Sequence, residues 1–466
     1  MCRGARTEPD TRHERAPAHM SLPADNTLAY MDQGSYLALR ALGRGPVIQY
    51  VWIYERGVDM DGLRRFQRNL ARTLLGRRLE RSSIPLGRHH WVPCGASADI
   101  EIAATERRRD EVWDFVAERG NVPVDPEHGP PWHLAGQPLA EGGSVVTLVV
   151  AHTVADAAAL IESITHAVNG SGRDLDYPAP RCLSRRQALR RDLTITARSV
   201  REVPAAVLGA ARLARAQSDD LSESAKAVPV AAPRRHGERP VSLPTVSVRV
   251  DADEWDARAK ALGGSSNVLL AGVAARVGAA IGRVDDSGRV MLSLPVSERV
   301  ENDTRGNALN TITVMADPQL AHGDLRPIRS GIKAALVDLA TTREQLLAPL
   351  PLAPYTPKFL LRRLEKLVLK VGKPIGSSNS GALPEEVNRP DGTPADMFVA
   401  HSPEPGITAT DLDRMGGRLL LAAGTVGGAV CISVTSWEPG APNTKEALMQ
   451  AVKEAFYDFD LVATME

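Results

Sequence analysis

Residues 149–158 read Val149-Val150-Ala151-His152-Thr153-Val154-Ala155-Asp156-Ala157-Ala158, and no other stretch of the chain is as informative. A β-branched, apolar run over 145–150 stops at His152, and Asp156 follows before a helix-compatible segment. This pattern predicts a strand that carries a histidine at its end, with an acid capping the next helix. Histidine suits proton transfer near neutrality because its unperturbed pKa is about 6.5. His152 is therefore a candidate general base, and a histidine that merely closes a strand is the alternative.

The composition is globular and electrically balanced. The chain has 466 residues, of which 43% are hydrophobic and 24% charged, and Lys+Arg and Asp+Glu both total 56. General nucleic-acid binders carry a basic excess, and base stacking needs aromatic side chains, which make up only 4% of this sequence. The composition thus argues against a nucleic-acid partner, and the length favours two domains of about 200 residues each.

The cysteines and the N-terminal segment predict a cytoplasmic protein without a metal site. The first 19 residues contain charges and prolines but lack the apolar core of a signal peptide. Widely spaced cysteines without a Cys-x-x-Cys pair suggest neither zinc binding nor a disulfide framework. The four cysteines are Cys2, Cys94, Cys182 and Cys431.

The pattern of elements divides the chain into two halves. A polar, proline-containing segment at 218–243 predicts a linker. We expect a disordered tail at 1–25, an N-terminal domain at 26–217 that carries His152, and a C-terminal domain at 244–466. Each half begins with a strand and a helix and continues with mixed strands, which favours α/β architecture in the form of two α+β two-layer sandwiches.

Hydrophobic periodicity predicts the main elements. In the first half we expect a strand at 47–54 and helices at 61–75 and 106–119. In the second half we expect a helix at 268–281, capped by Ser266-Asn267.

The longest uncharged stretch, 419–437, is nearly long enough to span a bilayer. Gly427-Gly428 lies between two β-rich runs inside it. A β-hairpin that turns at these glycines is therefore the preferred interpretation.

Two basic segments have helical periodicity. The segment 358–373 is amphipathic, so it either packs on the core with a solvated basic edge or lies on a membrane surface. The segment 181–215 is rich in arginine and could meet coenzyme A phosphates, an acidic carrier domain or anionic lipid. The sequence does not choose among these partners.

Several ordered motifs together resemble the chloramphenicol acetyltransferase-like superfamily. Residues 151–157 are similar to its His-His-x-x-x-Asp-Gly motif, and 264–271 to its helix opening. Leu294-Pro295-Val296-Ser297-Glu298-Arg299, with Gly306-Asn307 after it, resembles its Pro-Val-Ser-x-Arg and Gly-Asn segment. Ser378-Asn379-Ser380-Gly381 resembles its Ser-Asn-x-Gly loop. The closest branches are wax ester synthase/diacylglycerol acyltransferase-type and polyketide-associated acyltransferases, with condensation domains as relatives.

The resemblance implies two similar domains with a tunnel between them. A thioester on coenzyme A or an acyl carrier protein enters from one face, and a hydroxyl or amine acceptor enters from the other. It implies that His152 is the general base, that no covalent enzyme intermediate forms, and that no resident cofactor is required.

The resemblance also assigns supporting roles. Asp156 is expected to hold the loop by pairing with Arg299, which would tie the domains together; a solvated Arg299 is the alternative. Ser378 and Asn379 are expected to bind substrate as hydrogen-bond donors, although an ordinary polar loop explains them equally. Asn307 is expected to bind substrate as well.

Two positions depart from the family pattern. Ala151 replaces the first histidine, which is usually regarded as structural, and Ala157 replaces a glycine. If position 157 needs a positive φ, alanine strains the loop; if it is helical, alanine is better than glycine by about 1 kcal/mol.

Three functions remain open on the sequence. The first is transfer of a fatty or polyketide acyl group from a thioester to a lipid or secondary-metabolite hydroxyl, with peripheral contact at the inner membrane surface as an option. The second is amide formation, as in condensation domains. The third is a catalytically degenerate protein that only binds a carrier or ligand, which the departures at Ala151 and Ala157 motivate.

Other histidines are weaker candidates. His89-His90 lacks a following acid and is interpreted as a turn before Trp91. His128 and His133 have no apparent third metal ligand and are interpreted as loop residues.

Overall fold

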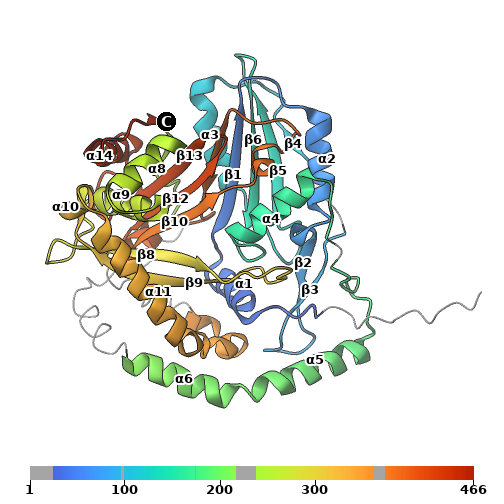
Figure 1. The fold of residues 1–466 in the computed structure, drawn as a ribbon. Coiled ribbons are helices and arrows are strands. Elements are labelled where there is room, and N and C mark those ends of the chain that lie inside the picture. The colour runs from blue at the N-terminus through green and yellow to red at the C-terminus, as the bar shows by residue number, and fades with distance from the viewer. Residues whose placement is uncertain (1–24, 96–98, 174, 217–237, 362–372) are drawn as a thin grey trace, which may run out of the picture.

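The computed structural model describes residues 25–95, 99–173, 175–216, 238–361 and 373–466. Its strands form one sheet of five strands, a second of seven and a small sheet of two, with helices packed on the larger sheets (Figure 1). The expected tail at 1–25 is described only at residue 25, and the expected linker at 218–243 only over 238–243.

The elements of the first half, in chain order, are α1 (Tyr30–Leu42), β1 (Val47–Tyr54), α2 (Met60–Leu70), η1 (Leu74–Gly76), β2 (Arg77–Glu80), β3 (His90–Pro93), β4 (Glu101–Ile102), η2 (Arg109–Glu111), α3 (Val112–Gly120), β5 (Trp132–Pro138), β6 (Ser144–Ala151), α4 (Ala157–Val168), α5 (Arg185–Val200) and α6 (Val203–Ala216).

The elements of the second half are β7 (Thr245–Asp251), α8 (Ala252–Ala261), α9 (Ser266–Ala280), β8 (Val290–Ser297), β9 (Leu309–Ala316), α10 (Pro318–Ala321), α11 (Arg326–Leu347), η3 (Leu350–Tyr355), β10 (Ile375–Ala382), η4 (Glu385–Asn388), β11 (Met397–His401), α13 (Ala409–Arg414), β12 (Arg418–Val426), β13 (Ala429–Trp437), α14 (Lys445–Asp458) and β14 (Thr464–Met465).

The five-stranded sheet has the order β11-β1-β6-β5-β4, and β6 delivers His152 at its end. Strands β1 and β6 are antiparallel and buried along their whole length, with Val47 opposite Ala151. Alternate side chains of β6 point to opposite faces. Val146, Leu148 and Val150 join the core beneath α2 and α4, whereas Val145 packs under α3. Because both faces are covered, the strand reads as a continuous apolar run.

Strand β11 comes from the second half of the sequence but belongs to the five-stranded sheet. It pairs antiparallel with β1, with Trp52 opposite Phe398. The expected assignment of 244–466 to a separate domain did not foresee this exchange. Periodicity identifies a strand but does not indicate which sheet edge it will join.

The seven-stranded sheet has the order β14-β7-β13-β12-β10-β8-β9. The expected hairpin is confirmed in β12 and β13, which pair antiparallel along their length. Gly427 and Gly428 form its turn with φ of 57° and 71°, a geometry that side chains with a Cβ rarely adopt. Among the described helices, none combines the length and apolarity that crossing a membrane requires.

Several predicted helix ends were wrong. Helix α2 ends at Leu70 rather than at 75, because Thr73 caps the separate 3-10 turn η1. Helix α3 begins at Val112, after another 3-10 turn, rather than at 106. Helix α9 already includes Ser266, whose hydroxyl accepts a hydrogen bond from Trp255 instead of capping.

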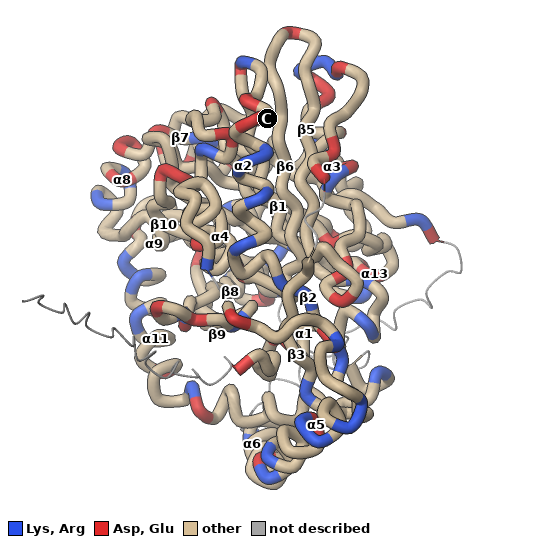
Figure 2. Tube along the Cα trace, turned by 90° about the vertical axis from the view of Figure 1, so that its right-hand side faces the viewer, with Lys and Arg blue, Asp and Glu red and all other residues tan. Residues whose placement is uncertain are grey.

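The basic segment 181–215 is helical, as expected, but it forms two helices, α5 and α6. Figure 1 shows them end to end across one end of the molecule. The charged residues are marked along the trace in Figure 2, where blue positions recur on α5. The predicted helix at 358–373 is described only to residue 361, and those first residues are helical.

Candidate active site

The loop between β6 and α4 is fixed at its far end by Asp156. Its Oδ1 atom accepts a hydrogen bond from the backbone N–H of Ala159 at 2.8 Å, as an N-cap does. Ala157 is the first residue of α4. The departure from glycine is therefore compatible with the backbone, and alanine is the better helix former there.

Arg299 reaches Asp156 from the second half of the chain. Its Nη2 atom lies 2.9 Å from both carboxylate oxygens, and both side chains are buried. The backbone N–H of Ala308 donates to Oδ2 of the same carboxylate at 2.8 Å. The solvated alternative for Arg299 is therefore wrong, and the loop that carries His152 is bound to the second half.

His152 is half-buried and its ring orientation is fixed. Its Nδ1 atom lies 3.0 Å from Oδ1 of Asn307. An amide oxygen only accepts hydrogen bonds, so Nδ1 carries the proton in the neutral ring. Within the described residues Nε2 has no hydrogen-bond partner. The lone pair of Nε2 is therefore available to take a proton.

Asn307 is itself held by a buried aspartate that sequence reasoning missed. Its Nδ2 atom donates to Oδ1 of Asp32 at 3.2 Å and to the backbone carbonyl of His152 at 3.0 Å. These two acceptors fix which way the amide points. Asn307 was expected to bind substrate, whereas its polar atoms are engaged by the protein. In this arrangement it positions His152.

Asp32 lies on α1 and is completely buried. It also accepts the backbone N–H groups of Gly306 at 2.8 Å and Asn307 at 2.7 Å. Burial raises the pKa of its carboxyl, while these donors and the nearby Arg77 oppose the shift. It is the only acid of α1, and no other sequence signal points to it.

Two further residues shape the loop. A Cβ at Gly306 would lie 2.9 Å from the carbonyl oxygens of Thr153 and Val154, so the segment can pass there only as glycine. The buried side chain of Arg77 donates to the carbonyls of Thr304 and Val154, linking the histidine loop to the second half. Gly306 belongs to the Gly306-Asn307 segment that the sequence resemblance included, whereas Arg77 was not singled out from the sequence.

Ser378 and Asn379 lie in strand β10 rather than in a loop. The Nδ2 atom of Asn379 lies 3.4 Å from the hydroxyl of Ser266, and its Oδ1 atom accepts the N–H of Gly381 at 2.8 Å. In the described part of the chain, neither residue is hydrogen-bonded to His152. Their expected role in substrate binding stays a prediction.

A cavity of about 570 Å³ extends from the histidine loop between the two halves. Thr153 and Pro46 line it, and the carbonyl of Pro46 accepts the backbone N–H of His152 at 3.2 Å. Most of its wall is apolar and comes from Ala38, Leu39, Leu42, Leu361, Pro374, Met415 and Leu419. The cavity thus suits a hydrocarbon chain beside the histidine.

The structure corrects the assignments of His90 and His133. His90 begins strand β3 and is fully buried, with Nε2 3.0 Å from Oδ1 of Asp192 on α5. It is not a turn residue, and its acidic partner lies far away in sequence. His133 lies in β5, and both its ring nitrogens are buried without a hydrogen-bond partner among the described residues.

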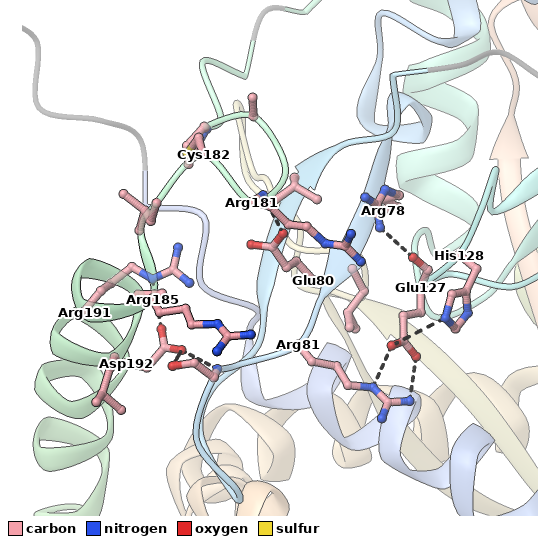
Figure 3. Close-up of a pocket in the computed structure, with 18 residues that line it drawn as sticks. Arg78, Glu80, Arg81, Glu127, His128, Arg181, Cys182, Arg185, Arg191 and Asp192 are labelled. Atoms are coloured by element: carbon pink, nitrogen blue, oxygen red, sulfur yellow. Dashed lines mark hydrogen bonds and ion pairs between the residues drawn. The ribbon is translucent and has the colours of Figure 1, made fainter.

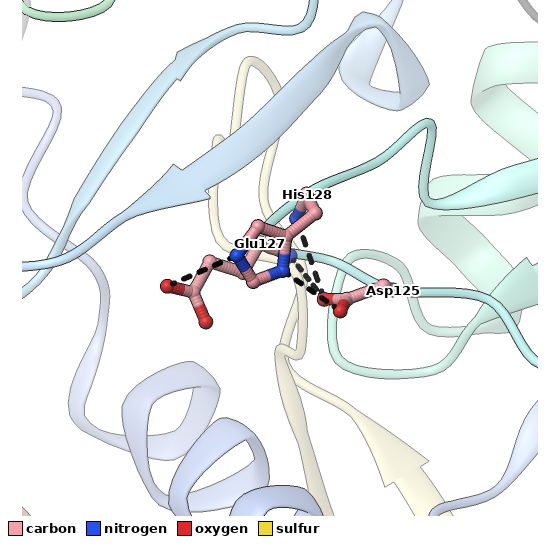
Figure 4. Close-up of side chains that lie close together, drawn as sticks. All are labelled: Asp125, Glu127 and His128. Atoms are coloured by element: carbon pink, nitrogen blue, oxygen red, sulfur yellow. Dashed lines mark hydrogen bonds and ion pairs between the residues drawn. The ribbon is translucent and has the colours of Figure 1, made fainter.

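His128 lies near two acids, Asp125 and Glu127, in an arrangement that resembles a metal site (Figure 4). Its Nδ1 atom is 2.9 Å from Asp125. Both acids already pair with Arg40, at 2.9 Å and 2.6 Å. Because the carboxylate charges are compensated by arginine, this cluster is better explained as an ion-pair network than as a metal centre.

No protein-family model matches the chain, and no curated protein matches it. Solved structures do match. The first condensation domain of the calcium-dependent antibiotic synthetase, in complex with a substrate analogue, has a TM-score of 0.54 at 16% identity, covering 93% of this chain and 96% of that one.

Two further solved structures are similar over nearly the whole chain. Wax ester synthase/diacylglycerol acyltransferase from Marinobacter aquaeolei VT8 has a TM-score of 0.51 at 15% identity, covering 93% of this chain and 100% of that one. Polyketide synthase associated protein 5 from Mycobacterium tuberculosis has a TM-score of 0.51 at 16% identity, covering 94% and 100%. The chloramphenicol acetyltransferase-like fold expected from the motifs is confirmed, and at these identities the likeness establishes the fold alone.

Proposed function

We propose that the protein is an acyltransferase that moves an acyl group from a thioester to a hydroxyl, with His152 as the general base. The observation that carries this proposal is the hydrogen bond between Nδ1 of His152 and Asn307, which places the proton of the neutral ring on Nδ1 and leaves Nε2 without a hydrogen-bond partner among the described residues. A base must present a lone pair where the acceptor proton will be, and this arrangement does so.

The chemistry balances without a cofactor. Nε2 of His152 takes the proton of the acceptor hydroxyl while the hydroxyl oxygen bonds to the thioester carbonyl carbon. The tetrahedral species then collapses, the carbon–sulfur bond breaks, and the imidazolium returns the proton to the departing thiolate. The products are an ester and a free thiol, and the histidine is regenerated.

The cavity beside Thr153 supports an apolar acyl group as the transferred unit. Its lining is mostly aliphatic, and a hydrocarbon chain placed there would be removed from water at about 0.8 kcal/mol per CH₂. Charged residues line the cavity too, but Glu404 pairs with Arg44 and Arg418, so the apolar part of the wall is where a fatty or polyketide acyl group would lie. Coenzyme A and an acyl carrier protein are the two proposed donors.

A lipid acceptor would be met at a membrane surface. Helices α5 and α6 expose apolar side chains, including Leu193 at 52% and Leu208 at 59% of their surface. Arg186 and Arg190 are exposed on α5 as well. Apolar and cationic groups on one exposed face are the features by which interfacial helices hold anionic membranes. They support peripheral membrane contact as part of this proposal.

The decisive experiment compares wild type with His152→Ala, using acyl-coenzyme A of several chain lengths and a mixed panel of alcohols and amines. Thiol release and acylated products are followed by mass spectrometry. We expect an ester product in wild type and a loss of about 100-fold or more in the variant. His166→Ala, which removes an exposed histidine on α4, should retain activity.

The other outcomes separate the alternatives. An amide as the main product would contradict ester formation and favour condensation chemistry, which is the alternative suggested by the likeness to a condensation domain. Equal, near-zero turnover by wild type and variant with both coenzyme A and carrier-bound donors would favour a protein that only binds. Product that forms equally in both proteins would contradict the role of His152.

A further inference from the structure

A second pocket, of about 720 Å³, lies on the outer side of the small sheet β2–β3 (Figure 3). It is bounded by β2, the loop that carries Glu127, the segment 178–183 and the first turns of α5. Arg77 points from β2 toward the histidine loop, whereas its neighbour Arg78 lines this pocket. Successive residues of a strand face opposite sides, so the pocket is separated from His152 by the small sheet.

The acids that line the pocket are already engaged. Asp192 accepts hydrogen bonds from Ser83 and from His90, and Arg191 pairs with it at 2.9 Å. Glu127 is held by Arg40 and Arg81. Glu80 accepts the backbone N–H of Arg181 at 2.9 Å. Each of the three acids that line the pocket, Glu80, Glu127 and Asp192, thus already accepts a hydrogen bond from the protein.

The arginines are not fully compensated. Five line the pocket, namely Arg78, Arg81, Arg181, Arg185 and Arg191. In the described chain Arg78 donates to the backbone carbonyl of Glu127 at 2.9 Å and pairs with no carboxylate. The guanidinium groups of Arg181 and Arg185 have no partner there. In Figure 3 that of Arg181 reaches past Glu80 toward Arg78, and that of Arg185 extends from the start of α5 toward β2. Three arginines without a carboxylate partner among the described residues therefore line one concavity.

We infer that this pocket binds a phosphate-bearing small molecule of about nucleotide size, with the phosphate held by Arg78, Arg181 and Arg185. Planar guanidinium groups bind phosphate oxygens in pairs of parallel hydrogen bonds, which lysine cannot do. The first turn of α5 also lies at the pocket, and the positive end of a helix dipole favours an anion. The inference does not depend on acyl transfer, because the pocket does not contain His152.

Direct binding tests it. Titration calorimetry on the full chain at low ionic strength uses 3′-phosphoadenosine 5′-phosphate, coenzyme A, inorganic phosphate and phosphate-free pantetheine. We expect the phosphorylated ligands to bind and pantetheine not to bind. Tighter binding of the nucleotides than of inorganic phosphate would identify a nucleotide site, and equal binding would identify a site for phosphate alone.

A pair of charge-matched variants locates the site. The double variant R181A/R185A should weaken binding of 3′-phosphoadenosine 5′-phosphate by about 10-fold or more. R186A/R190A removes the same charge from exposed positions of α5 outside the pocket and should change the affinity by less than about two-fold. The His152→Ala variant should bind as wild type does, so binding and turnover can fail separately.

Three results would overturn the inference. One is the absence of binding to any phosphorylated ligand by wild type. Another is equal weakening in both double variants, which would mean diffuse attraction to α5. The third is binding only to vesicles rich in phosphatidylglycerol, lost in R186A/R190A, which would make the outer face of α5 a membrane contact and leave the pocket without its ligand.

Discussion

Asn307 accepts the hydrogen bond of Nδ1 of His152 at 3.0 Å, across 155 positions of sequence. The same amide donates to Asp32 and to the carbonyl of His152, so one residue fixes the tautomer, the ring orientation and the loop. The base proposed for acyl transfer is therefore assembled from three distant parts of the chain.

Asn307→Ala should lower kcat by about 10- to 100-fold, because partners that orient a reactive imidazole have effects of this size. KM should change less than kcat if Asn307 acts through His152, because its polar atoms are hydrogen-bonded to His152 and Asp32. The pH–rate profile should also change, because Nδ1 loses the acceptor that selects one tautomer. Steady-state kinetics over a range of pH measures both effects.

Asn310→Ala is the matched control for this variant. Asn310 donates to Glu298 at 2.6 Å and has no contact with His152. It should leave the pH–rate profile unchanged. If Asn307→Ala altered only KM or only the thermal midpoint, a positioning role for Asn307 would be excluded.

Breaking the pair between Asp156 and Arg299 should destabilise the fold. Arg299→Ala leaves a buried carboxylate without its cation, which typically costs about 3–5 kcal/mol. Urea unfolding gives the free energy of unfolding directly. Arg343→Ala removes a half-exposed partner of Glu298 and should cost about 1 kcal/mol or less. Equal losses in the two variants would contradict the structural role of Arg299.

Gly306→Ala should reduce both stability and activity. The added methyl group would meet the carbonyl oxygens of Thr153 and Val154 at 2.9 Å, so the histidine loop has to move. Overpacking of this kind costs about 1–3 kcal/mol. Gly57→Ala, where nothing lies within 4 Å of the new methyl group, is the comparison. If Gly306→Ala had the same thermal midpoint and rate as wild type, the added methyl group would not clash with the two carbonyl oxygens.

The free energy of unfolding should fall as the pH drops from 6.5 toward 4. His401 is buried, and burial together with Lys445 lowers its pKa from 6.5 to about 4. In that window the unfolded chain binds a proton that the folded chain does not, so acid favours unfolding; above pH 6.5 this contribution is constant. The change attributable to His401 is about 3 kcal/mol at most.

His401→Gln isolates this effect. The variant should show a weaker dependence of its urea midpoint on pH between 6.5 and 4 than wild type does. Part of the dependence should remain, because burial also lowers the pKa of His89 to about 4. An unchanged slope in His401→Gln would rule out His401 as a source of acid sensitivity.

Local patterns predicted the elements that carry the site. The apolar run before His152 and the acid four residues later gave strand β6, the loop and the N-cap of α4, because strand burial and helix capping depend on neighbouring residues. The ordered motifs predicted the fold. They also suggested that Arg299 lies near Asp156. The spacing alone did not show whether the two side chains form an ion pair or whether Arg299 is solvated.

Other relationships had no local signal. Asp32 lies in a segment without a recognisable motif, and Asn307 was assigned to substrate because nothing in its own surroundings points to His152. His90 was interpreted as a turn residue because its partner, Asp192, is 102 positions away. The pairing of β11 with β1 was not predicted either, since a strand pattern does not identify its neighbours.

The sequence by itself determined the hairpin at Gly427-Gly428 and the buried strand that ends at His152 beside a capping acid. Those outcomes follow from periodicity and capping, which act over a few residues. Only the tertiary structure decided that Asn307 and Asp32 fix the imidazole and that Arg299 closes the loop. It also decided that three arginines of one pocket lack carboxylate partners within the described part of the chain. Hydrogen bonds and ion pairs depend on distances in space of about 3 Å, and packing brings such groups together irrespective of their separation along the chain.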